Sequence, residues 1–103
     1  MSVVVVAHIH PKPGQAPKVL AGFEAVADLV HAEAGCELYA AHTDGDLVIM
    51  VERWASREDL AAHSTGAALE RLGQLNDGLT ERDADVWVLD NVPMGDPAKG
   101  TIQ

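Results

Sequence analysis

Histidine is the side chain best suited to chemistry in this sequence, with five copies among 103 residues. Imidazole titrates near neutral pH, so it can serve as a general base, a metal ligand or a helix cap. His63 is the leading catalytic candidate, because it stands three residues before Gly66, where a helix is expected to break. It either caps the last carbonyls of that helix or faces a gap between helix and sheet, where it could deprotonate a phenol.

Two other histidines have the spacing of a strand pair. His8 and His10 lie two residues apart in an apolar run, so their side chains point to the same face and could together bind a metal ion. His42 is expected on a strand separated from them by one other strand, about 10 Å away. We therefore expect no three-histidine metal site within one chain, and place these imidazoles at the rim or at an interface.

Glu52 and Trp54 form a second candidate pair, because alternate residues of a strand share a face. A tryptophan beside a carboxylate either forms the floor of a pocket for an aromatic ligand or fills the core. The single cysteine, Cys36, has no base near it in the sequence and is predicted to be a small buried residue. Sequence motifs for acyl transfer, nucleoside triphosphate binding and Rossmann-type cofactor binding are not found.

The composition narrows the choice of partners and compartment. Seven basic against sixteen acidic residues give a formal net charge of −9, which repels phosphate backbones and anionic lipids, so nucleic acid is not an expected partner. The apolar run Val3–Ala7 is far shorter than the roughly 20 residues of a membrane-spanning helix. With no signal-peptide pattern and no possible intrachain disulfide, we expect a cytoplasmic protein without a membrane segment.

The hydrophobic periodicity predicts the elements that position these residues. The first half of the chain is predicted to contain, in order, a strand, a helix ending at a left-handed Gly35, and two strands joined by a tight two-residue turn at Asp44-Gly45. These elements span Val3–Ile9, Ala16–Glu33, Cys36–Thr43 and Leu47–Trp54. Ser56 is predicted to cap a second helical region, which Gly66 breaks, and Asp85–Leu89 is the last strand.

This order of elements predicts an α+β, ferredoxin-like βαββαβ fold. Numbered along the chain, the strands should form a sheet in the order 4-1-3-2, with residues 1–91 as the domain and Val92–Gln103 as an extended arm. Both helical regions of such a fold cover one face of the sheet, yet the first strand is apolar on both faces. We therefore expect a homodimer, in which two sheets pack face to face as a dimeric α/β barrel.

Several short motifs occur in an order that resembles one family. The chain is similar to the antibiotic biosynthesis monooxygenase (ABM) domain family, including its quinol monooxygenase-like members. The resemblance is carried by Lys12-Pro13-Gly14, Gly35-Cys36, Tyr39, Glu52-Arg53-Trp54, Ala62-His63-Ser64 and the tail Val92–Gly100. It implies a dimeric barrel that oxidises phenolic, quinol or polyketide-type aromatics with O₂ and without flavin, haem or metal.

An oxygenase of this kind needs an apolar cavity with few polar groups. The cavity is expected between sheet and helices, with His63 as the catalytic base and Tyr39 and Trp54 as aromatic contacts. Its apolar walls are expected to be Val5, Ala7, Leu60, Leu69 and Leu72. Two alternatives stay open: a barrel protein that binds a small hydrophobic ligand without catalysis, and a polyketide cyclase or isomerase.

Overall fold

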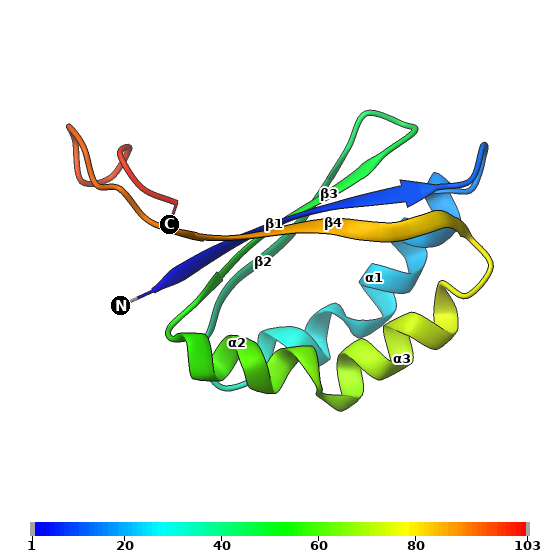
Figure 1. Ribbon diagram of the computed structural model, residues 1–103, viewed down its shortest axis with the longest axis horizontal. Coiled ribbons are helices and arrows are strands. Elements are labelled where there is room, and N and C mark those ends of the chain that lie inside the picture. Colours follow the sequence, from blue (N-terminus) through cyan, green and yellow to red (C-terminus); the bar gives the residue numbers. More distant parts are fainter. Residues whose placement is uncertain (1, 103) are drawn as a thin grey trace.

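One antiparallel sheet carries all the helices on a single face (Figure 1). The computed structural model describes residues 2–102. Its elements are β1 (Val3–Pro11), α1 (Ala16–His31), β2 (Cys36–Thr43), β3 (Val48–Trp54), α2 (Arg57–Ser64), α3 (Ala67–Leu75) and β4 (Thr80–Asp90). The strand order β2-β3-β1-β4 is the predicted one, so the ferredoxin-like βαββαβ fold is confirmed.

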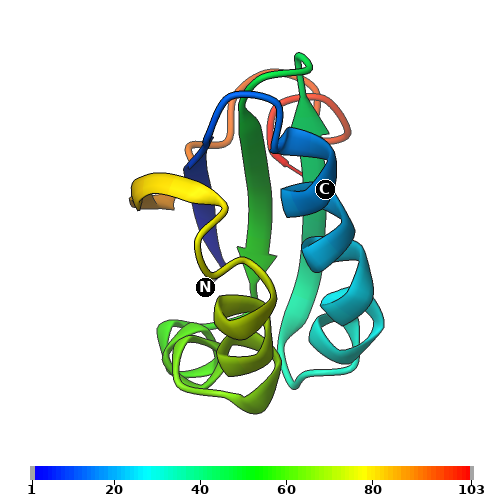
Figure 2. The same cartoon turned by 90° about the vertical axis from the view of Figure 1, so that its right-hand side faces the viewer.

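The core lies between this sheet and the helices. β1 occupies an interior position of the sheet, and its alternate residues from Val3 to Ile9 point toward the helices and are buried. Fully buried valines of α1 meet them and the inner face of β3. As Figure 2 shows, α1 runs along one side of the helical layer, whereas α2 and α3 occupy the other side. The edge strand β4 keeps Val86, Trp87 and Val88 between 42% and 57% exposed.

The end of α1 differs from the prediction, whereas the start and end of α2 agree with it. α1 ends at His31 and not at Glu33. The Ala32 N–H still bonds to the Asp28 carbonyl, four residues back, but the Glu33 N–H bonds to the Val30 carbonyl, three residues back, so the regular α-helical pattern stops there. Gly35 has the expected positive φ of 78°, but it follows the helix end at some distance and leads into β2. The break between α2 and α3 at Gly66 is confirmed, as is the Ser56 cap, whose hydroxyl accepts from the Asp59 N–H.

The turn between β2 and β3 is longer than predicted. The last strand pair is Thr43 with Val48, so four residues form the connection and β3 begins one residue later than expected. The Asp44 carboxylate accepts the backbone N–H groups of Asp46 and Leu47, which stabilises this wider loop.

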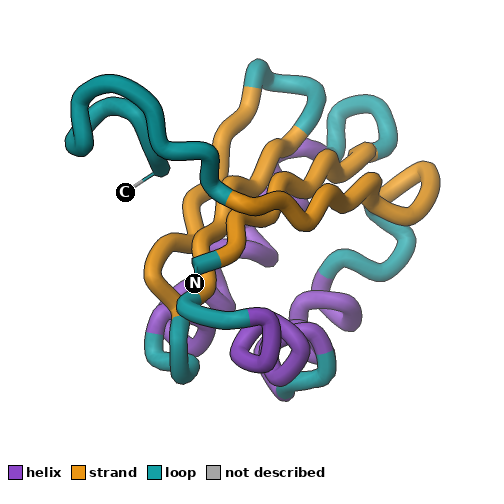
Figure 3. Tube along the Cα trace, turned by 60° about the vertical axis from the view of Figure 1, so that its left-hand side comes forward, coloured by secondary structure: helices purple, strands orange, loops and turns teal. Residues whose placement is uncertain are grey.

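The strand β4 is also longer than the predicted Asp85–Leu89. It begins at Thr80, where an exposed and largely charged segment pairs with the end of β1 and extends that strand to Pro11. The residues before Asp85 show no hydrophobic alternation, so no sequence pattern indicated this first part of the strand. Beyond Asp90 the described arm has no helix or strand and folds back, and Arg53 Nη1 donates to the Ile102 carbonyl at 2.7 Å (Figure 3). Gln103 lies outside the described residues.

No helix within residues 2–102 has the length and apolar character needed to cross a bilayer.

Replacement of Gly35 by alanine should destabilise the fold. Its positive φ is strained for any residue with a Cβ, and the added Cβ would overlap the Asp59 carboxylate. We expect Gly35→Ala to lower the free energy of unfolding by about 3 kcal/mol in urea denaturation. Gly14→Ala is the matched control, because Gly14 also has a positive φ, +77°, but a Cβ added there would meet no atom within 4 Å. This variant should lower the free energy of unfolding by only about 1 kcal/mol. Equal losses in both variants would contradict the role given to the contact with Asp59.

Candidate functional site

A cavity of about 510 Å³ lies between the sheet and the helices. The structure brings seven of the eight predicted site residues to its lining. These are Val5, Ala7, Tyr39, Leu60, His63, Leu69 and Leu72. The eighth, Trp54, is fully buried behind the lining. Most of the wall is apolar, and its buried ionisable groups are Glu52, His63 and Tyr39.

His63 faces this cavity and does not cap the end of its helix. It is the buried residue of α2 and is only 5% exposed. Its Nδ1 lies 2.7 Å from Glu33 Oε1, so the Glu33 carboxylate accepts the Nδ1–H and leaves the lone pair on Nε2. Nε2 is 3.9 Å from Glu52 Oε1, beyond hydrogen-bond distance. A basic nitrogen is thereby held at the wall of an apolar cavity.

Glu52 and Trp54 share one face of β3, as strand alternation predicted, and the structure shows that it is the inner, buried face. Trp54 Nε1 donates to Glu52 Oε1 at 3.0 Å, and its ring lies 4.4 Å from the His63 ring at an interplanar angle of 30°. Burial raises the pKa of the Glu52 carboxyl, while the hydrogen bond from Trp54 and the nearby His63 oppose that rise. Trp54 therefore fills the core and also forms a platform under the imidazole.

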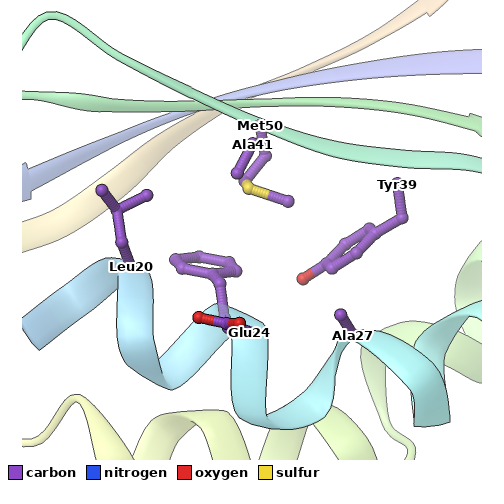
Figure 4. A pocket seen from close by; sticks show the side chains of 7 residues that line it. Leu20, Glu24, Ala27, Tyr39, Ala41 and Met50 are labelled. Carbon is purple, nitrogen blue, oxygen red and sulfur yellow. The ribbon is translucent and has the colours of Figure 1, made fainter. Parts of the chain in front are cut away.

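Tyr39 completes the aromatic surroundings of His63. It stands opposite Glu52 on the neighbouring strand, and its ring lies 5.6 Å from His63 at an angle of 67°. Burial, followed by the charges of Glu52 and Glu33, raises the pKa of the Tyr39 hydroxyl well above its usual range, so this group stays a hydrogen-bond donor. It belongs to both the main cavity and a smaller one of about 260 Å³, beside α1 (Figure 4).

The smaller cavity has little chemistry of its own. Tyr39 and Met50 project from the sheet toward α1, which supplies Leu20, Glu24 and Ala27 (Figure 4). Its lining has no imidazole and no buried acid. The larger cavity, which His63 lines, is therefore the candidate functional site.

Sequence reasoning missed Glu33, which lies 30 positions before His63 in the chain. The sequence showed it only as the last residue of a predicted helix. Its role arises because the loop after α1 comes close to the end of α2, where a Cβ on Gly66 would lie 3.1 Å from Glu33 Oε2. No local pattern could have indicated this long-range contact.

The remaining candidates lie apart from the cavity. Cys36 is partly buried, and burial together with the Glu33 charge raises the pKa of its thiol, which is the opposite of what a nucleophile needs. His42 lies on β2, separated from β1 by β3 as expected. Within residues 2–102, the group that could hold a metal ion is His8, His10 and Asp85.

A family model and several solved structures are similar to this chain. The family model described as antibiotic biosynthesis monooxygenase matches residues 2–74. Rv0793 from Mycobacterium tuberculosis is 27% identical, with a TM-score of 0.79 over 93% of this chain and 100% of that one. PA3566 from Pseudomonas aeruginosa is 26% identical, with a TM-score of 0.79 over 88% of this chain and 94% of that one.

A protein from Caulobacter crescentus, provisionally named an antibiotic biosynthesis monooxygenase, is 23% identical. It covers 88% of this chain and 90% of its own, with a TM-score of 0.79, and this likeness bears on the fold alone. A comparison with curated proteins gives no match.

The raised pKa of Glu52 predicts a pH-dependent stability. As pH rises from about 4, the unfolded chain releases its Glu52 proton first, while the folded chain holds the proton until its higher pKa is reached. This residue therefore makes the free energy of unfolding fall with rising pH. Glu52→Gln, which still accepts from Trp54, should lose that part of the pH dependence in urea denaturation between pH 4 and 7.

The control for this experiment is Glu70→Gln, which removes an exposed carboxylate from α3. It should keep the pH dependence of the wild-type protein. If Glu52→Gln and wild type respond to pH in parallel, the burial argument for Glu52 is wrong.

Proposed function

The chain belongs to the antibiotic biosynthesis monooxygenase family, which supports a general monooxygenase-like function, and from this premise we propose a specific activity. The protein oxidises a small phenolic, quinol or polyketide-type aromatic with O₂ and without a cofactor. The observation that supports this most directly is the His63 imidazole, oriented by Glu33 at the wall of a cavity of about 510 Å³. That volume falls within the range of small-molecule sites.

The proposed reaction begins with proton transfer. His63 Nε2 accepts the proton of the aromatic hydroxyl, and the Glu33 carboxylate stabilises the imidazolium that forms. The electron-rich phenolate then supplies the electrons that reduce O₂. One oxygen atom enters the organic product and the other leaves as water, so no external reductant is needed.

The other residues around the cavity have supporting roles in this proposal. The apolar walls, among them Leu60, Leu69 and Leu72, exclude water from the phenolate and its products. The Tyr39 hydroxyl can donate a hydrogen bond to a substrate oxygen. Trp54 keeps the imidazole plane in position, and Glu52 keeps negative charge near the developing imidazolium.

We further propose that the protein is a homodimer built on the outer face of the sheet. No described helix covers that face (Figure 3). Apolar side chains from all four strands lie on it: Val4, Val6, Leu38, Ala40, Ile49, Val51, Trp87 and Leu89. In the arm, Val92 and Met94 are each 68% exposed. A second copy that buries this face, with the arm crossing onto it, removes these apolar groups from water.

The activity is tested by oxygen uptake with hydroquinones, naphthols and anthrones, after subtraction of autoxidation. We expect His63→Ala to lower kcat by about 100-fold or more while binding is retained, because the base is lost. Glu33→Gln should lower kcat by about tenfold at unchanged KM, because it weakens the orientation and charge stabilisation of His63. His42→Ala, far from the cavity, is the control and should match wild type.

The same assay separates the alternatives. Saturable binding of these compounds without oxygen uptake would support the non-catalytic binding protein. Conversion of a substrate without oxygen uptake would support a cyclase or isomerase. Full turnover in His63→Ala would contradict the role of His63.

The dimer proposal predicts an effect of the arm. Removal of residues 92–103 should weaken dimerisation by at least about tenfold in sedimentation experiments, because the exposed apolar residues of the arm no longer reach the partner. Trp87→Ser should act in the same direction through the sheet face. An unaltered dimer after removal of the arm would contradict the crossing arm.

A further inference from the structure

A second cluster of ligand-type side chains lies on the outer face of the sheet. His8 and His10 project from β1 with ring centroids 4.2 Å apart, and Asp85 projects from β4. The His10 Nε2 and Asp85 Oδ2 atoms are 2.9 Å apart. One donor atom from each residue lies within 4.8 Å of the other two.

The irregular pairing of β1 with β4 brings these three residues together. His8 pairs with Asp85, but His10 pairs with Arg82, so two residues of β4 lie opposite the single residue of β1 between the two histidines. A β-bulge of this type bends the strand and redirects a side chain. Here it brings the carboxylate of Asp85 within reach of His10 as well as of its direct partner, His8.

We propose that His8, His10 and Asp85 form a binding site for one divalent transition-metal ion of the Zn²⁺ type. Two imidazoles and a carboxylate are a usual ligand set for such an ion, and three protein ligands leave a position for water. Ligand atoms around a tetrahedral zinc ion are about 3.3 Å apart. His10 Nε2 and Asp85 Oδ2, at 2.9 Å, would therefore move apart, and any pair nearer the 4.8 Å limit would move closer.

Arg82 is the group that competes with the ion. Its Nη2 lies 3.2 Å from His10 Nε2 and 3.5 Å from Asp85 Oδ2. His10 Nε2 cannot donate to Asp85 and accept from Arg82 at the same time, so the two contacts are incompatible in one protonation state. A metal ion on this nitrogen resolves the conflict, and the Arg82 side chain, 66% exposed, is free to swing into water.

None of the three proposed ligands lines the cavity that contains His63, so the site is separate from the proposed oxygenase site, although Arg82 borders that cavity and the ligands lie on the sheet face proposed for the dimer. Metal binding is therefore measured without any substrate. The test uses isothermal titration of the untagged, metal-stripped full chain with Zn²⁺. Visible absorption of added Co²⁺ gives a second readout of the ligand geometry.

We expect one Zn²⁺ per chain for wild type and for His42→Ala, a control that removes another histidine of the same sheet. His8→Ala, His10→Ala and Asp85→Asn should each weaken binding at least about tenfold. Arg82→Gln should strengthen it about two- to fivefold, because the competing charge is gone. Circular dichroism establishes that each variant is folded.

Two results would overturn the proposal. The first is absence of stoichiometric Zn²⁺ binding to wild type. The second is binding that the folded His8→Ala and Asp85→Asn variants retain at wild-type affinity.

Discussion

The burial of β1 is the constraint on which the other features depend. This strand lies between β3 and β4, so its backbone is paired on both edges. Its side chains alternate between the two faces of the sheet. Val5 and Ala7 line the cavity, whereas Val6 and His8 face the opposite side. A shift of one residue in its register would exchange these two sets of side chains. Both the cavity wall and the outer face of the sheet therefore depend on the register of this strand.

The candidate site is an acidic environment built around one imidazole. Glu33 and Glu52 approach His63 from a helix end and from the sheet, and the Trp54 N–H partly offsets the cost of burying the Glu52 carboxylate. This arrangement suits the proposed proton transfer, because two acidic side chains can stabilise an imidazolium once it forms. In that proposal the apolar and aromatic walls retain the ligand.

Most of the fold follows from patterns that the sequence displays directly. The continuous β-branched run of β1, the extended run of β3 and the helical period after Ala16 predict the layers, and strand parity places Val5 and Ala7 on one face of β1. Two features do not follow. Glu33 depends on a contact between elements far apart in the chain, and Asp85 depends on a bulge in a polar edge strand that has no hydrophobic signature.

Two glycines set the distance between the acid and the imidazole. Gly35 lets the loop after α1 approach Asp59 at the start of α2, and Gly66 leaves room for Glu33 beside the end of the same helix. Both ends of α2 are thus packed against the segment that carries the acid. An insertion or deletion in the loop after α1 would separate Glu33 from His63 without changing either residue. A comparison of relatives for a shared activity should therefore examine the length of this loop as well as the identities of Glu33 and His63.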